Sequence, residues 1–207
     1  MYKNAMGVVA AIRHAAGERL GRPRKWRLLQ RLPTGAVCAE VGVYKGDNSR
    51  HILKYAKPRE LHLIDGWWTV EGDTYEHPWY QIVGEQPDTR AAYAQVEALA
   101  RKHPQCLLHV GDDLEILPTF ADRYFDWVYL DSSHEYGHTV KELDLLERKV
   151  KTVICGHDWF PDPASEHHGV YRAVSELCSH GNWRVTWTDD WDQWAIERTG
   201  VRSVFGD

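Results

Sequence analysis

The sequence has no closely spaced pair of cysteines and no long apolar run. Its four cysteines stand far apart, at Cys38, Cys106, Cys155 and Cys178. This spacing excludes zinc ligands in CxxC pairs and a dense disulfide framework. No apolar stretch approaches the roughly 20 residues of a membrane-spanning helix, and residues 1–20 resemble an amphipathic helix more than a signal peptide. We therefore expect a cytoplasmic protein with reduced thiols and no membrane partner.

Positive charge is scarce outside the first 31 residues. That segment carries eight lysines and arginines against the single acidic residue Glu18, a net charge of +7, while the whole chain of 207 residues has a net charge of −5. Residues 32–207 therefore sum to −12, which argues against a nucleic-acid groove. We expect residues 1–32 to be a basic helical segment whose charged face is solvated, contacts an acidic second subunit as in a homodimer, or binds phosphate. Residues 33–207 are expected to form one domain.

Apolar segments of strand length alternate with segments of helical periodicity along this domain. Buried strands are predicted at 36–44, 60–68, 106–113, 125–131 and 151–159. Helices are predicted at 47–56, 88–103, 114–121, 134–150 and 169–181, and a terminal antiparallel hairpin at 182–199. Asp47 or Asn48 would cap the first of these helices and Asp88 the second. The order predicts an α/β fold, with a mostly parallel seven-stranded sheet and helices on both faces.

Each predicted strand of the parallel part ends in polar residues. These are Glu40 and Gly42, Asp65, Asp112, Asp131, and His157 with Asp158. Ligands bind outside the carboxyl ends of parallel strands, so this alignment predicts one site at that edge. Gly42 lets the backbone approach a ligand, and Asp65 follows it by 23 residues, near the place where a carboxylate receives ribose hydroxyls. The alternative for Asp65 is an ordinary Asp-Gly turn.

Four segments occur in an order that resembles the class I S-adenosylmethionine-dependent methyltransferases: EVGVYKGDNS, LIDGW, VGDDLEILP and DWVYLDSSHEYGHTVKEL. The resemblance implies a Rossmann-like fold with S-adenosyl-L-methionine as the cofactor. It places Glu40, Gly42 and Ser49 at the methionine part of the cofactor, Asp65 at the ribose, and Asp112 with Asp113 at the adenine edge. The other predicted cofactor residues are Gly66, Trp67, Gly111 and Asp131. The absence of a third glycine fits a cofactor that has no pyrophosphate to bind.

The ends of the fourth and fifth predicted strands carry groups suited to catalysis. Methyl transfer needs an aligned nucleophile and an acceptor for its proton, and an alkyl hydroxyl is a poor nucleophile at neutral pH. A divalent metal and a base overcome this difficulty. Asp131 and Asp158 are expected side by side, and with His157 they form a predicted site for Mg²⁺ or Mn²⁺.

The segments LDSSHEY, CGHDW and GVYRAVSEL are similar to those of metal-dependent O-methyltransferases that act on sugar hydroxyls, including macrolide-sugar and mannoside types. This resemblance implies that Asp131 and Asp158 bind the metal and that His134 is the general base. His157 stands where that group has an acidic residue, which leaves the third ligand and the metal open. The predicted acceptor is a sugar, a short oligosaccharide or a similar small molecule.

Other interpretations of these residues are available. Ser132 or Ser133 would cap a helix that begins near His134, and Asp131 would then cap a neighbouring amide. His138 lies four residues after His134, in a segment (HEYGH) that matches the HExxH pattern of zinc sites, but it is predicted to face solvent. The two histidines of the SEHHG segment are predicted loop residues that follow the metal strand and could touch the substrate.

The role of the aromatic segment and the reaction catalysed also have alternatives. Trp67 and Trp68 are predicted near the cofactor, and the aromatic segment that they begin is either a core plug or a lid that stacks on a sugar. The first alternative function is catechol-type O-methylation, although the lower pKa of a phenol makes a histidine base less necessary. A less favoured alternative is a hydroxylase whose iron is bound by Asp131, His134 and His157.

Overall fold

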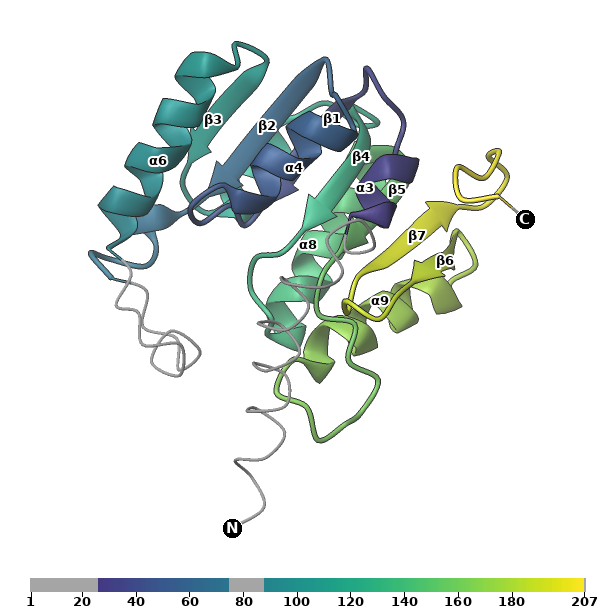
Figure 1. The fold of residues 1–207 in the computed structure, drawn as a ribbon. Coiled ribbons are helices and arrows are strands. Elements are labelled where there is room, and N and C mark those ends of the chain that lie inside the picture. Colours follow the sequence, from purple (N-terminus) through teal and green to yellow (C-terminus); the bar gives the residue numbers. More distant parts are fainter. Residues whose placement is uncertain (1–25, 75–87, 207) are drawn as a thin grey trace.

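A single sheet of seven strands organises the chain. The computed structural model describes residues 26–74 and 88–206. The strands are β1 (Val37–Val41), β2 (Glu60–Asp65), β3 (Cys106–Val110), β4 (Phe125–Leu130), β5 (Val150–Gly156), β6 (Trp183–Thr188) and β7 (Trp194–Arg198). Their order is β3-β2-β1-β4-β5-β7-β6, and β7 runs antiparallel to both neighbours while β1 to β5 are parallel. Figure 1 shows β2, β3 and β4 pointing toward one edge and β7 pointing the other way. The predicted fold class is confirmed.

Helices cover both faces of the sheet. They are α3 (Arg27–Arg31), α4 (Asp47–Tyr55), α6 (Thr89–Lys102), α7 (Asp113–Ile116), α8 (Tyr136–Lys149) and α9 (His168–Ser179), with two short 3-10 helices, η1 (Trp67–Thr69) and η2 (Leu117–Thr119). The helices α3, α4 and α6 pack in one apolar core, and α8 and α9 pack in the other (Figure 1). Within the described residues, no helix is both long and apolar enough to cross a membrane.

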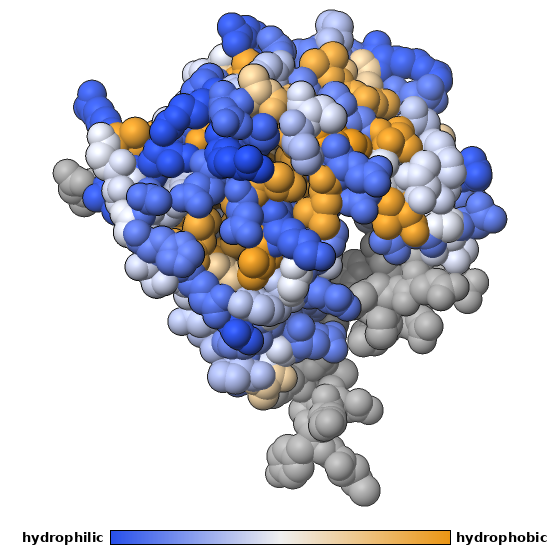
Figure 2. Space-filling model, turned by 180° about the vertical axis from the view of Figure 1, so that it is seen from behind, coloured by the Kyte–Doolittle hydropathy of each residue, from blue (hydrophilic) through white to orange (hydrophobic). Residues whose placement is uncertain are grey.

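The two cores follow from the alternation of side chains along the strands. Cys38 of β1 belongs to the core that contains Ile52 of α4, whereas its neighbour Ala39 belongs to the core that contains Leu146 of α8. Successive strand side chains point to opposite faces, so a central strand that is covered on both sides is largely apolar, with Glu40 as the polar exception in β1. The four cysteines are free thiols, as predicted. Seen from behind, the surface shows hydrophobic residues interspersed with hydrophilic ones (Figure 2).

Helix starts follow the prediction in one case and differ in another. Asp88 caps α6, because its side chain accepts a hydrogen bond from the amide of Ala91. Helix α4 begins after Gly46, whose φ of 74° is left-handed, and neither Asp47 nor Asn48 caps it. The chain turns into α4 through a backbone conformation that glycine adopts readily, so no side-chain cap is formed.

The capping interpretation of Ser132 and Ser133 is wrong. Helix α8 begins at Tyr136, with Glu135 as its N-cap. The hydroxyl of Ser132 donates instead to Glu142, in the second turn of that helix. The residues after β4 therefore form a loop before the helix starts.

Two predictions fall largely outside the described residues. Residues 1–25 contain most of the predicted basic segment, and residues 75–87 contain Tyr75, Trp79 and Tyr80 of the aromatic segment. The described end of the first segment, α3, buries Leu28 and Leu29 in the core.

Candidate active site

The register of the strands brings the predicted site residues to one edge. Val41 of β1 pairs with Ile64 of β2 and with Leu130 of β4, and Leu130 pairs with Gly156 of β5. The next residues along each strand therefore leave the sheet side by side, at the edge where ligands bind in such folds. They are Gly42, Asp65, Asp131 and His157.

Asp65 accepts hydrogen bonds from three backbone amides. Its Oδ2 accepts from Val43 at 2.7 Å and from Tyr44 at 2.8 Å, and its Oδ1 accepts from Trp67 at 2.7 Å. Bonds to an ionised carboxylate are among the stronger hydrogen bonds of a protein. They tie the loop after β1 to the end of β2, so Asp65 does more than begin a turn.

Glu40 is a buried carboxyl group on β1. It accepts a bond from Asn48 Nδ2 at 3.0 Å and another from the hydroxyl of Ser49, which is itself fully buried. Burial raises the pKa of Glu40 to about 8, and the nearby carboxylates of Asp131 and Asp65 act in the same direction. Glu40 is therefore mainly protonated at neutral pH.

Gly42 lies where the loops after β1 and β4 touch. Its φ is 83°, and a Cβ at this position would lie 2.1 Å from the carbonyl oxygen of Asp131. The amide of Gly42 donates to the carbonyl of Ile64 at 2.9 Å, and the amide of Asp131 donates to the carbonyl of Val41 at 2.8 Å. Any side chain at position 42 would collide with the backbone that positions Asp131.

Asp112 and Asp113 follow Gly111 and begin α7. Asp112 caps this helix, because its Oδ1 accepts from the amide of Leu114 at 2.8 Å. Asp113 lies 3.0 Å from Nε2 of His138. The prediction that His138 faces solvent is wrong, since this side chain is partly buried and its bond to Asp113 raises its pKa.

Trp67 lies in the core. Its ring is fully buried and meets Tyr93 edge-on with 5.1 Å between centroids, while its Nε1 donates to the carbonyl of Tyr44 at 2.9 Å. The preceding residue, Gly66, is packed so tightly that a Cβ there would lie 2.5 Å from the side chain of Val70. Of the two interpretations of the aromatic segment, the core plug applies to Trp67.

Asp131, His157 and Asp158 form a first group of possible metal ligands, as the sequence predicted. One ligand atom of each lies within 4.8 Å of the others, and His157 Nδ1 is 3.0 Å from Asp158 Oδ1. Burial lowers the pKa of His157, but the carboxylates of Asp158, Asp131 and Asp192 outweigh it and raise the pKa to about 9. Burial likewise opposes ionisation of Asp158, yet the charge of His157 outweighs it and lowers the pKa of Asp158.

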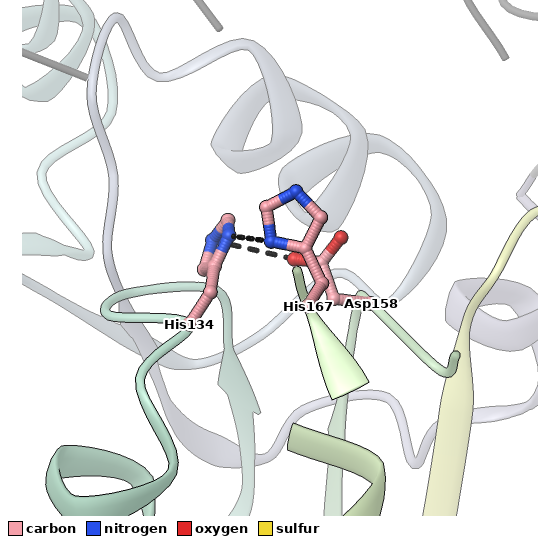
Figure 3. Close-up of side chains that lie close together, drawn as sticks. All are labelled: His134, Asp158 and His167. Carbon is pink, nitrogen blue, oxygen red and sulfur yellow. Dashed lines mark hydrogen bonds and ion pairs between the residues drawn. The ribbon is translucent and has the colours of Figure 1, made fainter. Parts of the chain in front are cut away.

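His134 and His167 form a second group with Asp158 (Figure 3). Nε2 of His134 lies 3.3 Å from Asp158 Oδ2, and its Nδ1 lies 2.7 Å from Nδ1 of His167. These three residues also offer ligand atoms within 4.8 Å of one another, so Asp158 is common to both groups. The sequence placed His167 only in a loop after the metal strand, and its contact with His134 was not predicted.

Three residues with side chains have a left-handed backbone at this edge. Their φ angles are 52° at Tyr44, 39° at Trp67 and 66° at Asp158. This conformation costs an L-residue roughly 1–2 kcal/mol, and such strain gathers at functional sites. The three residues follow β1, β2 and β5, so the strain lies along the predicted site.

An aromatic group beside the histidines was missed as well. Trp159 lies 4.8 Å from Tyr171 and 6.4 Å from Trp194 between ring centroids, and Phe160 lies 5.8 Å from His167. The only signal in the sequence was the pair of aromatic residues directly after Asp158. A pair of this kind is equally typical of a core.

Comparisons with known proteins agree with this fold. The model of a family described as a methyltransferase domain matches residues 39–159. Cofactor-bound Rv0187 from MTB has a TM-score of 0.61 and 16% identity, covering 100% of this chain and 93% of that one. A putative caffeoyl-CoA O-methyltransferase from Staphylococcus aureus has a TM-score of 0.57 and 14% identity, covering 92% of each chain. A putative rRNA-methylase from Clostridium thermocellum has a TM-score of 0.57 and 10% identity, covering 85% and 94%. No curated protein matches significantly.

At these identities the solved structures show the fold alone, whereas the family match reaches the site. The match begins just before Glu40 and ends just after Asp158, so it contains both the predicted cofactor residues and the predicted metal ligands. It also covers more than half of the chain. The chain belongs to this methyltransferase-domain family and is a class I S-adenosylmethionine-dependent methyltransferase.

Proposed function

We propose that the enzyme methylates a hydroxyl oxygen of a sugar or a similar small molecule with the help of a divalent metal ion. The observation that carries the proposal is the group of Asp131, His157 and Asp158 beside His134, at the edge where ligands bind in this fold. The resemblance of LDSSHEY and CGHDW to sugar O-methyltransferases supports the choice of acceptor.

The residues present fit a divalent ion. Asp131 and Asp158 offer carboxylate oxygens and His157 offers an imidazole nitrogen, a set that suits Mg²⁺ or Mn²⁺. Asp158 is 6% exposed and ionised, so it needs a positive partner, which a metal would supply in place of the proton on His157. A metal bound there lowers the pKa of an acceptor hydroxyl.

His134 is the proposed base for the acceptor proton. Its ring is held at both nitrogens, by Asp158 on one side and by His167 on the other. To accept a proton, His134 must exchange one of these contacts for the acceptor hydroxyl. The remaining contact then orients the ring and selects its tautomer.

The aromatic rings beside the histidines support a ring-shaped acceptor. Trp159 and Phe160 directly follow Asp158 and are partly buried. Flat aromatic faces pack against the apolar C–H face of a pyranose, and they also stack on a phenol. A histidine base favours the alkyl hydroxyl, because a phenol loses its proton more easily.

Turnover assays with S-adenosyl-L-methionine and a panel of sugars and catechols test the proposal. EDTA should abolish turnover and Mg²⁺ or Mn²⁺ should restore it. Asp131→Asn and Asp158→Asn should abolish turnover while leaving the affinity for S-adenosylhomocysteine largely intact. Asp162→Asn, an exposed aspartate in the loop after β5, is the matched control. Full activity in EDTA would overturn the role of the metal.

Two further variants separate the two groups that share Asp158. If Asp131, His157 and Asp158 hold the metal, His157→Asn should weaken Mn²⁺ binding and His167→Asn should leave it unchanged. The reverse result would assign the metal to His134, Asp158 and His167, and His134 would then be a ligand and not the base.

A further inference from the structure

A third group of ligand-type side chains lies apart from Asp158. Asp113, at the start of α7, is 3.0 Å from Nε2 of His138 on α8, and this nitrogen is 3.7 Å from Oε1 of Glu142. One ligand atom of each residue lies within 4.8 Å of the others. His138 and Glu142 are one helical turn apart and share a face of α8. The group therefore bridges α7 and α8.

Glu142 is fully buried, and the protein satisfies only part of its carboxylate. Its Oε1 accepts from the hydroxyl of Ser132. Its Oε2 has no hydrogen-bond partner among the described residues. A buried carboxylate oxygen without a partner is costly, so this position calls for a proton or a cation.

The charge of the group favours a cation. Asp113 and Glu142 contribute two carboxylates, and the carboxylate of Asp112 adds to the negative field at Glu142. His138 supplies one positive charge at most, and Lys141 is exposed on the same helix. A divalent ion bound to a neutral His138 would balance Asp113 and Glu142 without leaving a buried net charge.

We infer that Asp113, His138 and Glu142 bind a divalent cation, best represented by Mn²⁺ or Zn²⁺, at a site that joins α7 to α8. Carboxylate oxygens with an imidazole nitrogen suit both ions. Ser132, which bonds to Glu142, acts as an outer partner that orients this ligand. The site shares no ligand with the two groups that contain Asp158 and does not depend on the proposed function. It fixes the start of α7, where Asp112 is predicted to meet the adenine.

Mn²⁺ titration of the full chain, after treatment with EDTA, tests this inference. Calorimetry and electron paramagnetic resonance would count the bound equivalents. We expect one equivalent that His138→Asn and Glu142→Gln each weaken by at least about 100-fold and that Asp158→Asn leaves intact. Ser132→Ala should weaken the same equivalent by about 10-fold. Asp144→Asn, on the exposed face of α8, should change nothing.

The outcomes separate this site from the proposed catalytic metal. Mn²⁺ binding that only Asp158→Asn removes would support the strand-end site and overturn this one, and a proton shared by Asp113 and Glu142 would then explain the group. Mn²⁺ binding that only Glu142→Gln and His138→Asn remove would support this site and overturn the strand-end site. His138 is partly exposed, so His138→Asn carries the test if Glu142→Gln fails to fold, as judged by circular dichroism.

Discussion

At the ends of β1 and β2 the acid groups bond to backbone amides and neutral side chains, whereas at the ends of β4 and β5 they contact imidazoles. Asp65 accepts from three amides, and Glu40 accepts from an amide and a hydroxyl side chain. Asp158 instead lies between His157 and His134. The two halves of one sheet edge are therefore held together by different kinds of group.

This difference sets the charge of the two halves. Burial raises the pKa of Glu40 to about 8, because its partners are neutral. The pKa of Asp158 is lowered although it is also buried, because a charged imidazole outweighs the burial. The predicted cofactor half is thus held by bonds to backbone amides and neutral side chains. The predicted chemical half depends on protons or on a metal.

The largest effect is expected from replacing His134, the proposed base of the chemical half. His134→Gln should lower turnover roughly 10²- to 10⁴-fold, the range for loss of a general base, because the acceptor proton then has no receiver. The affinity for S-adenosylhomocysteine should stay unchanged. Steady-state kinetics and calorimetry measure these effects. His180→Gln, an exposed histidine at the end of α9, is the control, and a His134 variant with near-normal turnover would contradict the assignment.

A substitution at Gly42 tests the contact between the loops after β1 and β4, which joins the two halves. Gly42→Ala should lower the free energy of unfolding by about 3 kcal/mol, because the added methyl group meets the Asp131 backbone and the left-handed φ is strained. Urea unfolding measures the change. Gly200→Ala is matched in φ, at 80°, but its Cβ would meet nothing within 4 Å, so it should cost only about 1 kcal/mol. Equal losses in the two variants would show that position 42 tolerates a side chain.

The arrangement of the strand ends could be predicted from the sequence because it depends on local patterns. Buried strands that alternate with helices must form a parallel sheet, and polar residues after each strand then meet at one edge. Asp131, His157 and Asp158 follow neighbouring strands, and the structure places them within 4.8 Å. Nothing beyond the strand order was needed for this prediction.

Contacts between separate loops and helices could not be predicted in this way. His167, in the loop before α9, meets His134, in the loop after β4, and Asp113 meets His138 because α7 packs against α8. Such contacts depend on packing angles and loop paths, which leave no periodic signal in the sequence. The start of α4 differed from the prediction because the left-handed backbone at Gly46 begins the helix without the expected side-chain cap.

Glu40 is protonated at neutral pH, whereas Asp158 is ionised. The protonated state of Glu40 predicts that the stability of the fold depends on pH. The folded protein holds this proton up to a pH of about 8, against 4.5 for the group when unperturbed, so the stability of the wild type should fall as pH rises between these values. Glu40→Gln has no such proton, and at pH 7 it should be more stable than the wild type by about 3 kcal/mol, a difference absent below pH ~4.5. Thermal unfolding across pH measures it. Glu115→Gln, exposed on α7, should show no trend, and a pH-independent difference at Glu40 would contradict the protonated state.

The smallest effect is expected from Asp65→Ala, which should change cofactor affinity in one half and leave metal binding in the other half unchanged. Asp65→Ala removes the acceptor for the amides of Val43, Tyr44 and Trp67, so the loop after β1 should loosen and the affinity for S-adenosylhomocysteine should fall about 10-fold, or about 1.5 kcal/mol. Calorimetry measures this loss, with the exposed Asp73→Ala as the control. Mn²⁺ binding at the strand ends of β4 and β5 should be unchanged, because the three amides that Asp65 holds belong to the segments after β1 and β2. Unchanged cofactor affinity would remove Asp65 from the site, and weakened Mn²⁺ binding would show that the two halves are coupled through this loop.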